Sequence, residues 1–152
     1  MINRRDMLSR SAAVVAMLGS AGLLPTAAQA AYNAAVFDMK TMAEVVKALG
    51  GSAPTESKDV TITGPDIAEN GAVVPLGVAT SLAGVKQVML LVEKNPAVLA
   101  ALFNVTPDVE ANFSTRVKMG QSSNVFAVAV TNDNKVLFAQ KEVKVTLGGC
   151  GG

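Results

Sequence analysis

The chain has 152 residues, half of them apolar and 16% charged, with a formal net charge of +1. Thirteen Lys and Arg stand against twelve Asp and Glu, and neither sign forms a run, which argues against binding to nucleic acid or to an anionic membrane surface. The chain contains no His and one Cys, so its own residues cannot build a Cys/His zinc site, a Ser-His-Asp triad or a Cys-His pair. We therefore expect one small domain without such enzyme chemistry, and we expect no cofactor.

The first thirty residues differ in composition from the rest. Arginines gather in the first ten residues, and a small, apolar stretch follows from Ser11 to Leu24. That stretch is shorter than the roughly twenty residues of a membrane-spanning helix, and Ala28-Gln29-Ala30 fits an A-x-A cleavage site. We predict a cleaved signal peptide at 1–30, with an uncleaved amphipathic or membrane helix as the alternative.

The arginine pair in NRRDML, residues 3–8, resembles a twin-arginine export signal. Asn3 stands where that signal usually has Ser or Thr, and Met7 stands where Phe is common. We expect export to the periplasm by the twin-arginine route. No membrane anchor is expected, because no cysteine follows the cleavage site as it does in lipoproteins. Since this route carries folded proteins, export together with a partner chain is a further hypothesis.

An apolar stripe comes after the signal peptide. Its members recur at spacings of four, three, four and three, as on one face of a helix: Ala35, Met39, Met42, Val46 and Leu49. Gly50-Gly51 ends the stripe, because glycine enters the left-handed conformation that closes many helices. We expect this helix to pack on the core of its own domain, and an interaction surface at the methionines is the alternative.

From Lys58 onward, apolar residues alternate with polar ones, which is typical of β-strands. Pro75 cannot donate a ladder hydrogen bond, so its strand is predicted to be an edge strand or to carry a bulge. The mostly apolar run 85–92 suits a central strand, the segment IAENG (67–71) a turn, and Asn132-Asp133-Asn134 a hairpin turn. The predicted strands cover 58–63, 72–80, 85–92, 99–105, 113–119, 125–130, 135–140 and 143–147.

These short strands, with turns every eight to twelve residues, indicate a mainly β fold. We predict an immunoglobulin-like antiparallel β-sandwich of about seven strands with an N-terminal α-helix, spanning residues 31–147. The chain has no Trp and no pair of cysteines, so an antibody-type domain is excluded.

The only cysteine lies in the ending GGCGG, residues 148–152. Three residues beyond a strand ending at Leu147 carry Cys150 up to about 10 Å outward. The neighbouring glycines, which are Gly148, Gly149, Gly151 and Gly152, offer no side-chain shielding and wide backbone freedom, so the thiol could enter a narrow cleft of another protein. We predict that residues 148–152 form a flexible carrier arm. An engineered scar and a linker for a disulfide-bonded dimer are the alternatives.

The acidity of the thiol favours a carrier over a nucleophilic enzyme. A free cysteine, with a pKa of about 8.5, is only a few per cent ionised at neutral pH. The chain has no His to activate it, and the nearby α-carboxylate disfavours ionisation further. Activation of Cys150 would therefore come from the active site of a partner.

A predicted exported, immunoglobulin-like domain that ends in GGCGG resembles the SoxY family, the sulfur carriers of bacterial thiosulfate oxidation. The resemblance covers the predicted domain: ALGG at the end of the helix, IAENGAVVP (67–75), VEKNP (92–96), STRVKMG (114–120) and KEVKVTLGGCGG (141–152). The glycine-rich ending is the most specific of these motifs.

The resemblance implies a role for Cys150 as the site that covalently bears the pathway intermediates. It implies that haem-containing SoxAX joins thiosulfate to this thiol as a cysteine S-thiosulfonate, and that SoxB then releases sulfate by hydrolysis. It further implies that SoxCD, where present, oxidises the remaining sulfur, and that the carrier works as a heterodimer with SoxZ in the periplasm. A structural module that uses Cys150 for an intermolecular disulfide is the alternative.

Overall fold

The computed structural model describes residues 34–146 of the chain. The predicted signal peptide and the predicted arm lie outside these residues. The described elements are η1 (Ala34–Asp38), α2 (Met42–Ala48), β1 (Pro54–Glu56), β2 (Val60–Thr63), β3 (Ile67–Ala68), β4 (Val74–Thr80), β5 (Val85–Val92), β6 (Leu99–Asn104), β7 (Asn112–Val117), β8 (Ser123–Thr131) and β9 (Val136–Val145).

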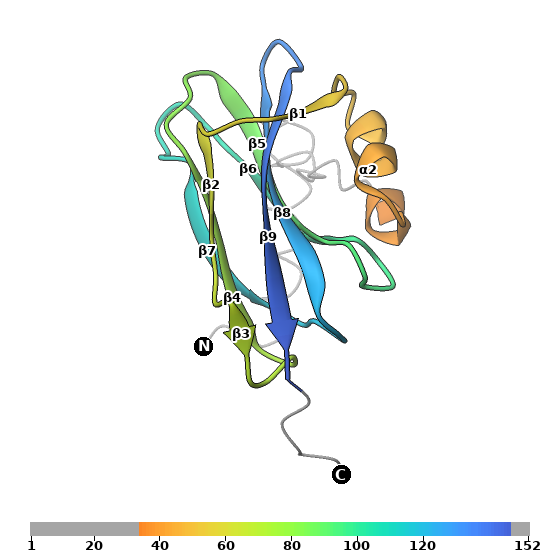
Figure 1. The fold of residues 1–152 in the computed structure, drawn as a ribbon. Helices are drawn as coiled ribbons and strands as arrows, with labels where there is room; N and C mark the ends of the chain where they lie inside the picture. The colour runs from red at the N-terminus through yellow and green to blue at the C-terminus, as the bar shows by residue number, and fades with distance from the viewer. Residues whose placement is uncertain (1–33, 147–152) are drawn as a thin grey trace, which may run out of the picture. The chain divides into compact units, whose positions relative to one another are not determined.

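The strands form two sheets packed face to face (Figure 1). The larger sheet has the order β1-β9-β8-β5-β6, with β3 also paired to β9, and the smaller sheet has the order β2-β4-β7. All pairings are antiparallel except those of β1 and β3 with β9, which are parallel. The predicted mainly β sandwich with a helix near the N-terminus is confirmed.

Two apolar clusters hold the domain together, one on each face of the larger sheet. The cluster between the sheets includes Leu76, Leu90 and Val143. The cluster on the outer face includes Val45 and Val46 of α2, packed over the larger sheet. Because both faces of β5 are covered, its residues from Val88 to Val92 form a continuous apolar run rather than an alternating one. The prediction of a central strand at 85–92 is therefore confirmed, and helix α2 packs on the core as expected.

The predicted continuous helix from Ala35 to Leu49 is wrong, because the chain forms η1 and then a separate helix α2. Thr41 is extended and caps α2: its hydroxyl accepts a hydrogen bond from the N–H of Glu44 at 3.2 Å, and its own N–H donates to the Glu44 carboxylate at 3.0 Å. Hydrogen bonds from the N–H groups of Lys40 and Thr41 lower the pKa of Glu44. The capping residue starts a new helix although the apolar spacing continues through it. Gly50, at φ +75°, ends α2 as predicted.

The strand containing Pro75 is not an edge strand. β4 lies between β2 and β7, so the prediction is wrong for the strand as a whole. The β2 partner runs only as far as Thr63 opposite Gly77, whereas Pro75 faces Arg116 of β7. Pro75 lies beyond the end of β2 and needs no donor on that side.

Nine strands are described rather than about seven. The two predicted segments 135–140 and 143–147 belong to one ten-residue strand, β9. The additional strands are β1 and β3, of three and two residues, which are too short to show an alternating pattern. The predicted turn IAENG accordingly begins with strand β3, which forms because β9 is available to pair with it.

Candidate functional site

The predicted site residues lie beyond the described part of the chain. Cys150 and the glycines Gly148, Gly149, Gly151 and Gly152 follow Thr146, the last described residue, so their roles remain predictions. What the structure describes is the C-terminal end of β9, to which these residues are joined in the sequence.

Strand β9 extends beyond its antiparallel partner. The register of β8 with β9 ends where Ser123 faces Val143. Beyond this pair the hydroxyl of Ser122 takes the place of a strand: it accepts a hydrogen bond from the N–H of Val145 at 2.9 Å and donates to the carbonyl of Val145 at 3.4 Å. One side chain thus engages both backbone groups of Val145.

The other edge of β9 is held by β3 and the residue before it. The N–H of Lys144 donates to the carbonyl of Asp66 at 2.9 Å, and the N–H of Thr146 donates to the carbonyl of Ala68 at 3.0 Å. Figure 1 shows β3 beside the end of β9. Backbone hydrogen bonds therefore continue to the last described residue.

Gly71 packs tightly under this strand end. A Cβ at Gly71 would lie 2.4 Å from the carbonyl oxygen of Met119 and 2.8 Å from Cγ1 of Val145. The carbonyl of Gly71 accepts a hydrogen bond from the N–H of Met119 at 2.7 Å. Met119 and Ala68 are buried in the cluster between the sheets, so the strand end is tied to the main core.

An ion pair fixes the segment that leads into β3. The Lys141 ammonium lies 2.9 Å from the Asp66 carboxylate and donates to the carbonyl of Gly64 at 2.6 Å. The hydrogen bond from Lys141, aided by its charge, lowers the pKa of Asp66. Lys141 is part of β9, so this contact joins the loop before β3 to the strand that carries the candidate site.

The loop after β5 completes the surroundings. The side chain of Asn95 donates to the carbonyl of Lys118 at 2.7 Å and accepts from the N–H of Gly120 at 3.4 Å. The N–H of Lys94 donates to the hydroxyl of Ser123, which is 3% exposed, at 3.0 Å. The segments IAENG, VEKNP and STRVKMG, far apart in the sequence, thus meet around the C-terminal end of β9.

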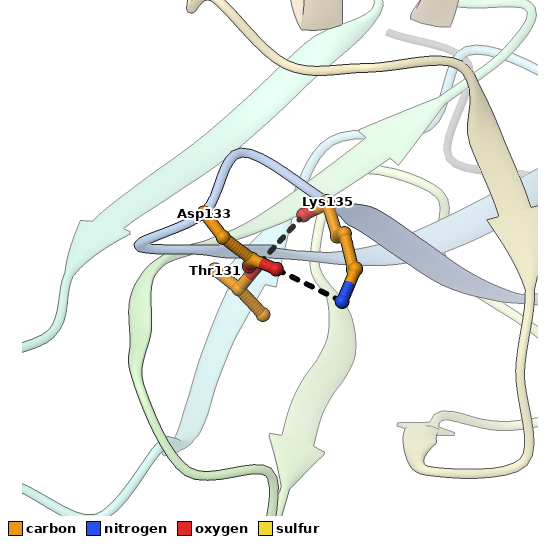
Figure 2. A network of polar contacts seen from close by, with 3 residues as sticks. All are labelled: Thr131, Asp133 and Lys135. Atoms are coloured by element: carbon orange, nitrogen blue, oxygen red, sulfur yellow. Dashed lines mark hydrogen bonds and ion pairs between the residues drawn. The ribbon is translucent and has the colours of Figure 1, made fainter.

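The opposite end of β9 is closed by a compact turn (Figure 2). The Thr131 hydroxyl lies within hydrogen-bonding distance of both the Asp133 carboxylate and the Lys135 carbonyl, and the Lys135 ammonium lies 2.9 Å from Asp133. The hydrogen bond from Thr131, followed by the contact with Lys135, lowers the pKa of Asp133 to about 2. Asp133 in turn raises the pKa of Lys135.

A wide open groove of about 1010 Å³ lies at this hairpin end, lined by residues from the loops after β4 and β6 together with Asn132. A smaller hollow of about 260 Å³, with Pro75 and Gly64 at its rim, lies on the smaller sheet. Residues 34–146 contain no cluster of three or more Asp, Glu or Cys side chains placed to hold a metal ion. Within the same range, no helix has the length and hydropathy needed to span a bilayer.

Sequence reasoning missed the residues that hold the end of β9. Ser122 gave no signal, because a serine before a strand is common in loops. The Gly71 position carried a partial signal, since Asn-Gly marks a tight turn, but the turn's contact with Met119 depends on packing between segments far apart in the sequence.

The chain is similar in sequence and in structure to a known family of sulfur oxidation proteins. A family model described as sulfur oxidation protein SoxY matches residues 45–150. The solved sulfur carrier protein SoxY from Chlorobium limicola f thiosulfatophilum shares 33% identity, covering 71% of this chain and 97% of that one, with a TM-score of 0.63. The chain belongs to the SoxY family. The prediction of this family is therefore confirmed, and the prediction of a carrier rather than an enzyme agrees with the name of the solved relative.

Other similar structures show the fold alone. The superoxide reductase neelaredoxin from Ignicoccus hospitalis shares 19% identity over 57% of this chain and 80% of that one, with a TM-score of 0.51. A variant of the same protein shares 17% identity over 71% and 100%, with a TM-score of 0.55. No curated protein sequence matches the chain. The SoxY match thus carries the functional inference.

Proposed function

We propose that this SoxY-family chain is a periplasmic carrier that binds thiosulfate-derived sulfur covalently on Cys150 and presents it to partner enzymes. The observation that carries the proposal is that the family match runs to residue 150 and so includes the only cysteine of the chain. The chain has no His to activate this thiol. A thiol without local activation suits a carrier whose chemistry is performed by its partners.

Loading of the carrier is an oxidation. The Cys150 thiol loses its proton, its sulfur bonds to the outer sulfur of thiosulfate, and two electrons pass to a haem-containing partner of the SoxAX type. Hydrolysis by a SoxB-type enzyme then breaks the bond between the outer sulfur and the sulfonate. Water supplies the oxygen of the departing sulfate, and a persulfide stays on Cys150.

The remaining persulfide sulfur is the substrate for a SoxCD-type dehydrogenase where the organism has one. A SoxZ-like chain is proposed as the heterodimer partner, and twin-arginine export as the route to the periplasm. The glycines around Cys150 support visits to several active sites, because they leave the thiol unshielded by neighbouring side chains.

Intact mass spectrometry of the protein purified from thiosulfate-grown cells tests the proposal. We expect species heavier by one S2O3 unit or by one sulfur atom, removable by dithiothreitol and absent from a Cys150→Ser variant. A preparation that contains only unmodified monomer and disulfide-linked dimer would instead support the structural module that uses Cys150 for an intermolecular disulfide.

A further inference from the structure

The C-terminal end of β9 is held by contacts that differ from those of the rest of the strand. Between Val136 and Val143, β9 is paired along one edge by β8. The three residues that follow have no β8 residue opposite them. In their place the chain brings together Ser122 and the segment 67–71, which contains both β3 and Gly71.

These contacts act on alternate sides of the chain. The N–H groups of Lys144 and Thr146 point toward β3, and the N–H of Val145 points toward Ser122. Every backbone donor from Lys144 to Thr146 is therefore satisfied without β8. Such complete pairing suppresses the fraying that is usual at the end of a strand.

Packing adds to the hydrogen bonds. The backbone of Gly71 lies so close to Val145 and Met119 that no side chain fits between them. Val145 itself packs against the cluster between the sheets, while Lys144 and Thr146 are exposed. The strand end is thus attached to the rigid core up to four residues before Cys150.

We propose that Ser122, Ala68 and Gly71 form an anchor that fixes the start of the C-terminal segment at Thr146 and so sets how far Cys150 can reach from the domain. The three are positioning residues, since they act on Cys150 only through the backbone of β9. The expected effect of the anchor on sulfur loading rests on the proposed carrier function. The expected effect of the anchor on the reach of Cys150 is independent of that function.

The expected size of the effect follows from chain geometry. Cys150 is four positions after Thr146, which allows a reach of about 14 Å at roughly 3.5 Å per residue. If β9 were released back to Val143, seven residues would span up to about 25 Å. The effective concentration of a tethered group falls roughly as the −3/2 power of tether length, so release would lower it about twofold at a partner docked on the domain.

Two variants loosen the anchor and leave residues 147–152 unchanged. Ser122→Ala removes the hydroxyl that holds Val145, and Thr146→Pro removes the N–H that donates to Ala68. Ser81→Ala is the matched control, because Ser81 is an exposed serine in the loop after β4 that borders the groove at the hairpin end. Thermal melting of each full-length variant establishes that the domain remains folded.

Two measurements on the isolated protein test the anchor independently of sulfur chemistry. Amide hydrogen exchange at Val145 should quicken about tenfold in Ser122→Ala, as for the loss of one hydrogen bond, and stay at the parent value in Ser81→Ala. A nitroxide attached to Cys150 should broaden amide signals over a wider part of the domain in both anchor variants than in the parent. Unchanged exchange at Val145, or an unchanged pattern of broadening in both variants, would overturn the anchor.

Loading with thiosulfate by a SoxAX-type partner tests the functional consequence. We expect the rate to fall in Ser122→Ala and in Thr146→Pro by at most the roughly twofold that full release back to Val143 would give, while alkylation of Cys150 by iodoacetamide keeps its parent rate. Wider broadening with an unchanged loading rate would show that reach does not limit transfer and would overturn this consequence. A parent protein that takes up no sulfur would contradict the carrier function itself, and the exchange and nitroxide results would still decide the anchor.

Discussion

The two ends of β9 are held in different ways. At the hairpin end, Thr131, Asp133 and Lys135 lie within five residues of one another and close the turn among themselves. At the C-terminal end, Val145 is held by a serine 23 positions away, and the Thr146 hydroxyl donates to a carbonyl 78 positions away. The side-chain contacts that close the hairpin turn are therefore local, although the turn also bonds to Gly84 and Lys86, whereas the contacts at the C-terminal end all come from distant segments.

This difference predicts that the C-terminal end is the more sensitive to a small change of volume. Gly71→Ala places a methyl group against the Met119 backbone, which cannot move without disturbing the core, so we expect a loss of about 2 kcal/mol in the free energy of unfolding. Gly120→Ala is the matched control, since nothing lies within 4 Å of a Cβ at Gly120. Urea unfolding of the two variants measures the contrast, and equal stabilities would refute the tight packing at Gly71.

The hairpin end should respond instead to backbone conformation. Asn134 has φ +63°, in the left-handed region that a β-carbon disfavours. Asn134→Ala and Asn134→Gly both lose the side-chain amide that accepts from Lys86, so their difference isolates the backbone. We expect the alanine variant to be less stable than the glycine variant by about 1 kcal/mol in urea unfolding. A glycine variant no more stable than the alanine variant would show that the turn relaxes out of this conformation.

The smallest expected effect is the pH response of the hairpin end. Asp133 has a pKa of about 2 in the folded protein against an ordinary value of 3.8, so its contribution to stability is present above about pH 3.8 and is lost as the pH falls toward 2. Thr131→Val removes the main cause and should raise the pKa of Asp133 toward its ordinary value. Lys135→Met, which removes both the hydrogen bond and the charge of Lys135, should raise it as well.

Carboxyl NMR titration of Asp133 in the two variants measures both changes. An unchanged pKa of Asp133 in either variant would show that the replaced residue does not lower it. Either way the titration concerns the hairpin end alone, since Asp66 at the other end of β9 has its pKa lowered by a different partner, Lys141.

Features that depend on local sequence could be predicted, whereas features that depend on contacts between distant segments could not. The hairpin at Asn132-Asp133-Asn134 and the central strand at 85–92 were predictable because turn chemistry and a doubly buried strand leave local patterns. The sequence also contains a signal for the division of the N-terminal helix, because Thr41 and Glu44 have the spacing of a capping box. The prediction missed it because the apolar spacing continues through Thr41. The position of β4 between two strands could not be read from Pro75, because it depends on where β2 ends.

The sequence by itself determined the class of the fold, the isolation of Cys150 among glycines and the lack of a histidine to activate it, because alternation and composition are properties of the chain alone. Only the tertiary structure decided that Ser122, β3 and Gly71 meet at the end of β9. The physical reason is that a two-residue strand and a single hydroxyl have too little intrinsic preference to specify a partner. They acquire one when burial of the core brings distant segments within hydrogen-bonding distance.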